Sequence, residues 1–120
     1  MSRPVLWISS MLWLMSGLAW AEMPDVDRSR ARPLEQWKQD IAQYSLNHYG
    51  EKEWRLRPRA IILHYTAGKS FPTNLVESSE FAGEKPGLAS HYILDGQTYW
   101  EIVPPDIRCR AAFGINHRAI

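Results

Sequence analysis

The sequence predicts an α/β domain in which a central mixed β-sheet is flanked by helices. Three local patterns support this: apolar residues at helical spacing over 34–49, a continuous apolar run over 60–65, and the pair Asp95-Gly96 between two β-prone segments. Helices that alternate with strands along a chain pack against the faces of a common sheet. We therefore expect one domain over residues 34–120.

The N-terminal segment predicts a secretory signal peptide over residues 1–21. Arg3 precedes a mostly apolar run over 5–19, and Ala19-Trp20-Ala21 matches an A-x-A cleavage signal. A membrane anchor is the alternative, but the run is shorter than the ~20 apolar residues that span a bilayer. We expect export to the periplasm or the extracellular space, with no stable membrane span after cleavage.

The charge balance bears on the class of partner. Cleavage would remove one of the 14 basic residues, Arg3, and none of the 13 acidic residues, so the formal charges balance. A nucleic-acid-binding chain needs a basic surface that releases counterions, and this composition argues against such a partner. Residues 22–33 are polar and contain two prolines, which predicts a flexible leader with solvated arginines.

A first helix is predicted over 34–49, and Gly50 ends it in a position that favours a left-handed cap. Its apolar face consists of positions three and four residues apart: Leu34, Trp37, Ile41, Tyr44 and His48.

The following elements are expected to build the sheet. Residues 60–65 predict a strand that is covered on both faces, and a second helix is expected from Ser70 or Thr73 through Phe81. Residues 90–94 and 98–103 predict a hairpin. Residues 116–120 resemble the approach to another strand, so we expect a domain that is cut short after the third or fourth strand.

Two motifs argue against other functions. Residues 67–70, Ala-Gly-Lys-Ser, resemble the end of a phosphate-binding loop, but the first glycine of such a loop would fall at Leu63, so no nucleotide is expected. Cys109 is the one cysteine, which excludes an internal disulfide. It could act as a nucleophile, but no glycine-rich turn or helix start exposes it, and we expect a small, partly buried residue.

His64 is the candidate for metal chemistry, because it follows an apolar strand where loops open a crevice in α/β sheets. A neutral imidazole there could bind zinc, whose catalytic sites use three protein ligands and a water molecule. One histidine is not a site, and His91 and His117 are the other histidines that could add ligands.

Three segments together resemble one enzyme family: "PRAIILHYTAG", "LASHYILDGQTYWEIVPPD" and "CRAAFGINHRAI". They are similar to N-acetylmuramoyl-L-alanine amidases, zinc enzymes with the type-2 amidase fold that peptidoglycan recognition proteins share. The resemblance implies that His64 is a zinc ligand and that His91 is not. It also implies a substrate groove near Tyr65, Ser90, His91 and Asn116.

The resemblance further implies a Zn²⁺ cofactor, peptidoglycan or muropeptides as partners, and cleavage of the amide between N-acetylmuramic acid and L-alanine. Relatives carry the general-base glutamate just after the position of Ile120 and two more zinc ligands farther on, and many have a histidine near Ala111. We therefore expect this chain by itself to be an inactive N-terminal part of an amidase. A non-catalytic peptidoglycan-binding module and a fragment that does not fold are the alternatives.

Overall fold

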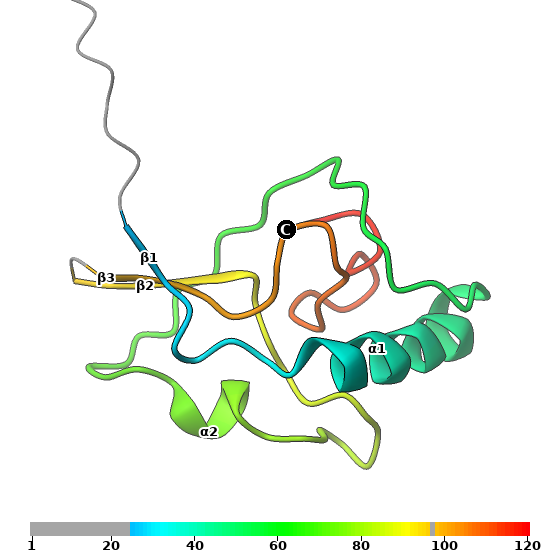
Figure 1. Cartoon of the computed structure of the whole chain (residues 1–120), viewed down its shortest axis with the longest axis horizontal. Helices are drawn as coiled ribbons and strands as arrows, with labels where there is room; N and C mark the ends of the chain where they lie inside the picture. The colour runs from blue at the N-terminus through cyan, green and yellow to red at the C-terminus, as the bar shows by residue number, and fades with distance from the viewer. Residues whose placement is uncertain (1–24, 97) are drawn as a thin grey trace, which may run out of the picture.

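In the computed structural model, residues 25–96 and 98–120 are described (Figure 1), so the predicted signal peptide and residues 22–24 of the leader lie outside the described part. Its elements are β1 (Val26–Asp27), α1 (Leu34–Tyr49), α2 (Thr73–Val76), β2 (Tyr92–Asp95) and β3 (Thr98–Glu101). A mixed three-stranded sheet together with helices agrees with the predicted α/β class. Within the described residues, no helix has the length and apolar character needed to cross a bilayer.

Helix α1 is confirmed with the bounds that the sequence predicts. Trp37, Ile41 and Tyr44 on its apolar face are buried, and they pack against a core from the second half of the chain: Ala89, Ile102, Val103, Ile107 and Cys109. Gly50 ends the helix at φ 78°, and its N–H donates a 3.1 Å hydrogen bond to the Leu46 carbonyl. A left-handed C-cap suits glycine because it has no Cβ to collide with the backbone.

The predicted hairpin is also confirmed. β2 and β3 pair antiparallel from Tyr92 opposite Glu101 to Asp95 opposite Thr98. β1 pairs in parallel with the other edge of β3, so the strand order is β1-β3-β2. The hairpin follows from local sequence, whereas the short β1 depends on contacts between distant residues.

The leader differs from its predicted flexible, solvated form over residues 25–33. Besides forming β1, it is held by three arginines that lie on the folded domain. Arg28 pairs with Glu101 at 3.1 Å and Arg30 with Glu77 at 2.9 Å. Arg32 is partly buried and its Nη2 donates hydrogen bonds to the carbonyls of residues 78 and 88.

Residues 60–65 do not form the buried strand that the sequence predicts. Residues 59–62 pair along one edge only, in parallel with residues 118–120, through three backbone hydrogen bonds of 2.8 to 3.0 Å. Leu63 and Tyr65 are 92% and 91% exposed. The prediction of burial was wrong because, among the described residues, no layer covers the apolar side chains of this segment.

The second helix is shorter than predicted and spans Thr73–Val76 rather than continuing through Phe81. Beyond it, the Ser78 carbonyl accepts a 2.8 Å hydrogen bond from Arg32 instead of one from a helical turn. Ser78 also donates its side-chain hydroxyl to the Glu80 carbonyl. Serine side chains that bond to nearby backbone compete with helix formation, which explains the early end of α2.

Candidate functional site

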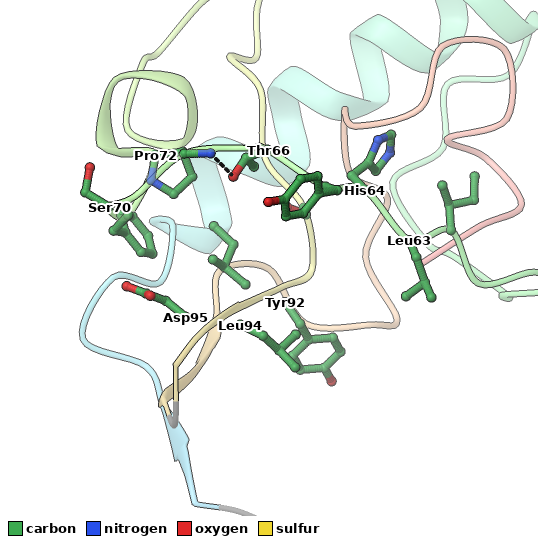
Figure 2. A pocket seen from close by; sticks show the side chains of 14 residues that line it. Leu63, His64, Thr66, Ser70, Pro72, Tyr92, Leu94 and Asp95 are labelled. Atoms are coloured by element: carbon green, nitrogen blue, oxygen red, sulfur yellow. Dashed lines mark hydrogen bonds between the residues drawn. The ribbon is translucent and has the colours of Figure 1, made fainter.

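A hollow of about 280 Å³ lies between the 62–72 segment and β2 (Figure 2). We call it the His64 groove, and its wall includes His64, Tyr65, Thr66, Phe71, Ser90 and Leu94. The lining mixes apolar side chains with hydroxyl groups and an imidazole. Such a combination is typical of sites that bind small polar ligands.

A smaller hollow of about 30 Å³ adjoins the groove and shares His64 and Ser90 with it. His91, Asn116 and the buried Cys109 line its other sides. The structure therefore gathers all five residues that the sequence assigns to the site around two adjoining hollows. Tyr65 lies in the groove, His91 and Asn116 lie at the small hollow, and His64 and Ser90 lie at both.

The His64 side chain is exposed where the two hollows meet. Its ring takes part in none of the hydrogen bonds found among residues 25–96 and 98–120, and in Figure 2 it projects from the backbone next to Leu63. The turn after it is held by a 3.4 Å hydrogen bond from the Gly68 N–H to Thr66 Oγ1. His64 is thus an imidazole with both nitrogens available for a ligand.

His91 differs from His64 because its ring is part of the core. The residue is 3% exposed, and its Nε2 lies 2.7 Å from the Ile107 carbonyl oxygen. The carbonyl can only accept, so Nε2 carries the proton. Burial lowers the pKa of His91, so the imidazole is neutral at pH 7 and supports the wall of the small hollow.

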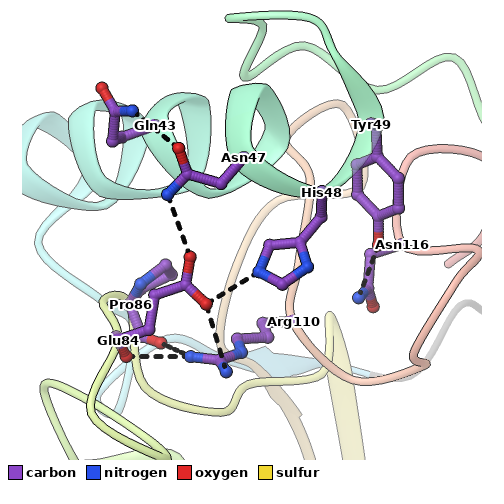
Figure 3. A network of polar contacts seen from close by, with 8 residues as sticks. All are labelled: Gln43, Asn47, His48, Tyr49, Glu84, Pro86, Arg110 and Asn116. Carbon is purple, nitrogen blue, oxygen red and sulfur yellow. Dashed lines mark hydrogen bonds and ion pairs between the residues drawn. The ribbon is translucent and has the colours of Figure 1, made fainter.

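Asn116 is likewise buried, and its amide is already engaged on both sides. Its Oδ1 accepts hydrogen bonds from the N–H groups of Ala111 and Ala112 at 2.8 and 2.6 Å. Its Nδ2 donates to the Tyr49 hydroxyl at 3.1 Å (Figure 3). These bonds hold the 111–116 turn against α1, so Asn116 shapes the small hollow.

The donor set for a metal is incomplete within the described residues. They contain no group of three or more histidine, cysteine, aspartate or glutamate side chains that could hold a metal ion. A catalytic zinc site uses three protein ligands. Residues 25–96 and 98–120 therefore offer His64 as one ligand and do not by themselves make a zinc site.

The structure also shows a polar network that the sequence did not predict, centred on Glu84 (Figure 3). Glu84 Oε2 lies 2.7 Å from His48 Nε2, and Asn47 donates to Oε1 at 3.1 Å. Arg110 lies 3.9 Å from the same carboxylate, and its Nη1 donates to the carbonyls of Glu84 and Pro86. The hydrogen bond from His48 is the main reason that the pKa of Glu84 is lowered.

This Glu84 network ties α1 to the 84–86 loop, and none of its charged residues lines the His64 groove. Its members lie 26 to 37 residues from Glu84 along the chain, so no local pattern could reveal them. The helical spacing placed His48 on the apolar face of α1, but the structure has it exposed, with its ring stacked on Tyr44 at 4.1 Å.

Cys109 is 2% exposed, and burial raises its pKa well above the ordinary value. Only a thiolate is an effective nucleophile. The sequence predicted a small, partly buried cysteine; the structure buries it more completely than that, and the geometry gives this thiol no access to a substrate.

Comparison with known protein families, with curated proteins and with solved structures finds no match to this chain.

Proposed function

We propose that this protein acts on peptidoglycan and carries part of the site of a zinc-dependent N-acetylmuramoyl-L-alanine amidase. The observation that supports the proposal best is the exposed His64 imidazole at the meeting point of two hollows. Tyr65 and Ser90, which the sequence resemblance assigns to the substrate groove, line the same space. The bond that would be cut is the amide between N-acetylmuramic acid and L-alanine.

The groove supplies contacts that suit an amide-bearing substrate. The hydroxyls of Thr66, Ser90 and Tyr65 can donate to a peptide carbonyl or accept from a peptide N–H. Phe71 and Leu94 offer apolar surface for methyl groups such as those of lactate and alanine. At about 280 Å³ the groove is suited to the region around the scissile amide rather than to a whole glycan strand.

Zinc enters the proposal through His64 alone. When bound, zinc would supply Lewis-acid chemistry at the substrate amide. The described residues contribute one imidazole, so a closed coordination sphere needs ligands beyond them. For that reason we assign substrate binding to the groove residues and no proton transfer to any of them.

A second function, that of a non-catalytic peptidoglycan-binding module, is favoured by the same groove residues. The hydroxyl groups and apolar side chains of the groove do not need a metal to contact a muropeptide. The two functions differ in whether His64 must hold zinc, and that difference can be measured.

The test uses the whole encoded protein, because the described residues supply only one zinc ligand. It is incubated with an N-acetylmuramoyl-L-alanyl peptide, with added Zn²⁺ or with a chelator, and products are detected by mass spectrometry. An amidase releases a peptide with a free N-terminal alanine, and His64→Ala should abolish both zinc binding and release. His48→Gln is the matched control, because His48 lies in the Glu84 network outside the groove.

Each outcome separates the two functions. Zinc-dependent cleavage that His64→Ala removes and His48→Gln retains supports the amidase. Muropeptide binding without cleavage, weakened by Ser90→Ala and unchanged by the chelator, supports the binding module. A protein that neither binds nor cleaves contradicts both.

Export through a cleaved signal peptide is part of the same proposal, because peptidoglycan lies outside the inner membrane. It rests on Arg3, the apolar run and the Ala19-Trp20-Ala21 signal. N-terminal sequencing of the protein recovered from the cell envelope should begin at Glu22. Recovery of the uncleaved chain from the cytoplasm would contradict export.

A further inference from the structure

A second cavity, of about 470 Å³, lies beside the segment that follows α1. We call it the arginine cavity, because Arg55, Arg57, Arg59, Arg108 and Arg118 line it. It shares no lining residue with the His64 groove or the small hollow. A ligand of the arginine cavity would therefore bind apart from the proposed amidase site.

The backbone explains how distant arginines converge there. The Leu56 N–H donates to the Asp106 carbonyl at 2.8 Å, and the Arg108 N–H donates to the Trp54 carbonyl at the same distance. Farther along, the Arg59 N–H donates to the Arg118 carbonyl at 2.8 Å. The 54–59 segment is thus hydrogen-bonded to the 106–108 segment and to Arg118.

Alternation within the segment turns the arginines to one side. In an extended chain, side chains two residues apart point the same way. Leu56, between the first two arginines, is 4% exposed and anchors the segment in the core. Arg55, Arg57 and Arg59 are exposed, and they line the cavity together with Arg118 and the buried Arg108.

The cavity carries an excess of positive charge. Two glutamates line it beside the five arginines, which gives the lining a formal charge of +3. Glu51 pairs with Arg108 at 3.3 Å and Glu53 with Arg55 at 3.5 Å. Among residues 25–96 and 98–120, Arg57, Arg59 and Arg118 form no ion pair, so mutual repulsion favours uptake of an anion.

Two buried nitrogens of the lining also lack partners within the described part of the chain: Nη1 of Arg108 and Nδ1 of His117. The Arg108 side chain is 7% exposed, and its Nε and Nη2 already donate to the Arg55 carbonyl and to Glu51. A buried polar group without a hydrogen bond destabilises the folded state. Nη1 of Arg108 can only donate, so it points to a ligand with acceptor oxygens, and His117 Nδ1 can add a hydrogen bond to such a ligand when it carries the ring proton.

We propose that the arginine cavity is a binding site for a phosphate group. Phosphate offers acceptor oxygens in several directions, and arginines from three chain segments surround the space that it would fill. A single carboxylate is satisfied by one guanidinium fork and would leave most of these arginines unpaired. The volume of about 470 Å³ exceeds that of free phosphate and suits a phosphate ester.

The test titrates the full chain with inorganic phosphate and with glycerol phosphate, at ionic strength held constant with sodium chloride, and follows arginine and His117 signals by NMR. We expect saturable shifts confined to the cavity. His117 gives a specific readout, because burial and the nearby charges of Arg118 and Arg108 lower its pKa. A bound anion should raise that pKa.

Paired variants separate site binding from general charge. Arg57→Gln with Arg59→Gln should weaken phosphate binding about tenfold or more, the equivalent of about 1.4 kcal/mol. Arg28→Gln with Arg30→Gln removes the same charge from the leader and should leave affinity within a factor of two. Equal weakening by both pairs would overturn the proposal, as would acetate binding as tightly as phosphate.

Vesicles distinguish the source of the phosphate. If vesicles with anionic phospholipid capture the chain, vesicles with zwitterionic lipid do not, and Arg57→Gln with Arg59→Gln abolishes capture, the phosphate is a lipid headgroup. If soluble phosphate esters bind and vesicles do not, the ligand is a small molecule. Absence of binding in every arm overturns the proposal, whether or not the muropeptide assay succeeds.

Discussion

At the scale of single residues, two histidines of the candidate site have opposite environments. His64 is exposed and unbonded within the described residues, whereas His91 is 3% exposed and donates to the Ile107 carbonyl. The sequence predicted that both lie at one site, and they line the same small hollow. The family resemblance implied that His64 and not His91 is a ligand. No pattern in the residues themselves indicated which imidazole is free, because the Ile107 carbonyl reaches His91 only after folding.

The buried His91 predicts a pH dependence of stability. Because burial lowers its pKa in the folded state, the unfolded chain binds a proton more readily. The stabilisation is therefore full above the ordinary histidine value of 6.5 and is lost as pH falls through the lower folded pKa. The free energy of unfolding from urea denaturation should fall between pH 7.5 and 5.5.

His91→Gln provides the control for that prediction. The glutamine amide can still donate to the Ile107 carbonyl but does not titrate, so the variant should lose less stability over the same range. Glu84 responds at lower pH, because its pKa is lowered from 4.5 and its stabilisation disappears only in stronger acid. An equal loss in wild type and His91→Gln would show that another group is responsible.

At the scale of elements, the close packing of Gly87 on the Ser78 carbonyl fixes the path of the chain after α2. A Cβ built on Gly87 would collide with that carbonyl, which is backbone and cannot move aside alone. Gly87→Ala should therefore lower the free energy of unfolding by about 2–3 kcal/mol. Thermal or urea denaturation followed by circular dichroism measures the change.

Gly68→Ala is the matched substitution. The nearest atoms to a Cβ at Gly68 lie 3.6 Å away, an ordinary contact, so this variant should stay within about 0.5 kcal/mol of wild type. If both variants unfold at the same denaturant concentration, the tight contact at Gly87 is not a determinant of this fold.

The elements also show which parts of a fold can be predicted from local sequence. α1 was predicted to the residue because its apolar spacing and the Gly50 cap are local signals. The hairpin was predicted from Asp95-Gly96 for the same reason. β1 was missed because two residues in a polar leader carry no strand pattern, and only pairing with β3 makes them a strand.

The arginine cavity also depends on contacts that local sequence does not reveal. Arg55, Arg57 and Arg59 recur at every second position of the sequence, and all three are exposed and line the arginine cavity. Arg108 joins them from 53 residues away, by donating from its Nε to the Arg55 carbonyl. No local pattern indicates that contact, so the converging charges appear only in the folded chain.

At the scale of the whole molecule, the hydrophobic core and the exposed apolar surface lie on different segments. The core joins α1 to residues 89–109, and its largest fully buried side chains include Ile41, Ile102 and Val103. Residues 60–63 form a continuous apolar run, yet none of them belongs to this core. The apolar pattern of 60–65 predicted burial, and that prediction was wrong for the described residues, because none of them covers these side chains.

That imbalance predicts self-association of this chain. Ile61, Leu63 and Tyr65 are 73%, 92% and 91% exposed. Residues 118–120 pair with one edge of this segment, and among the described residues no strand pairs with its other edge. Exposed apolar side chains on an extended edge favour pairing with another chain. Sedimentation velocity should show association that grows with concentration.

Leu63→Lys should shift the protein toward monomer, because a charge opposes such pairing and Leu63 has little packing to lose. Leu75→Lys, at a residue 49% exposed on α2, adds the same charge away from this edge and should not. A monomeric wild type at high concentration would contradict the prediction and would show that the exposed edge alone does not drive association.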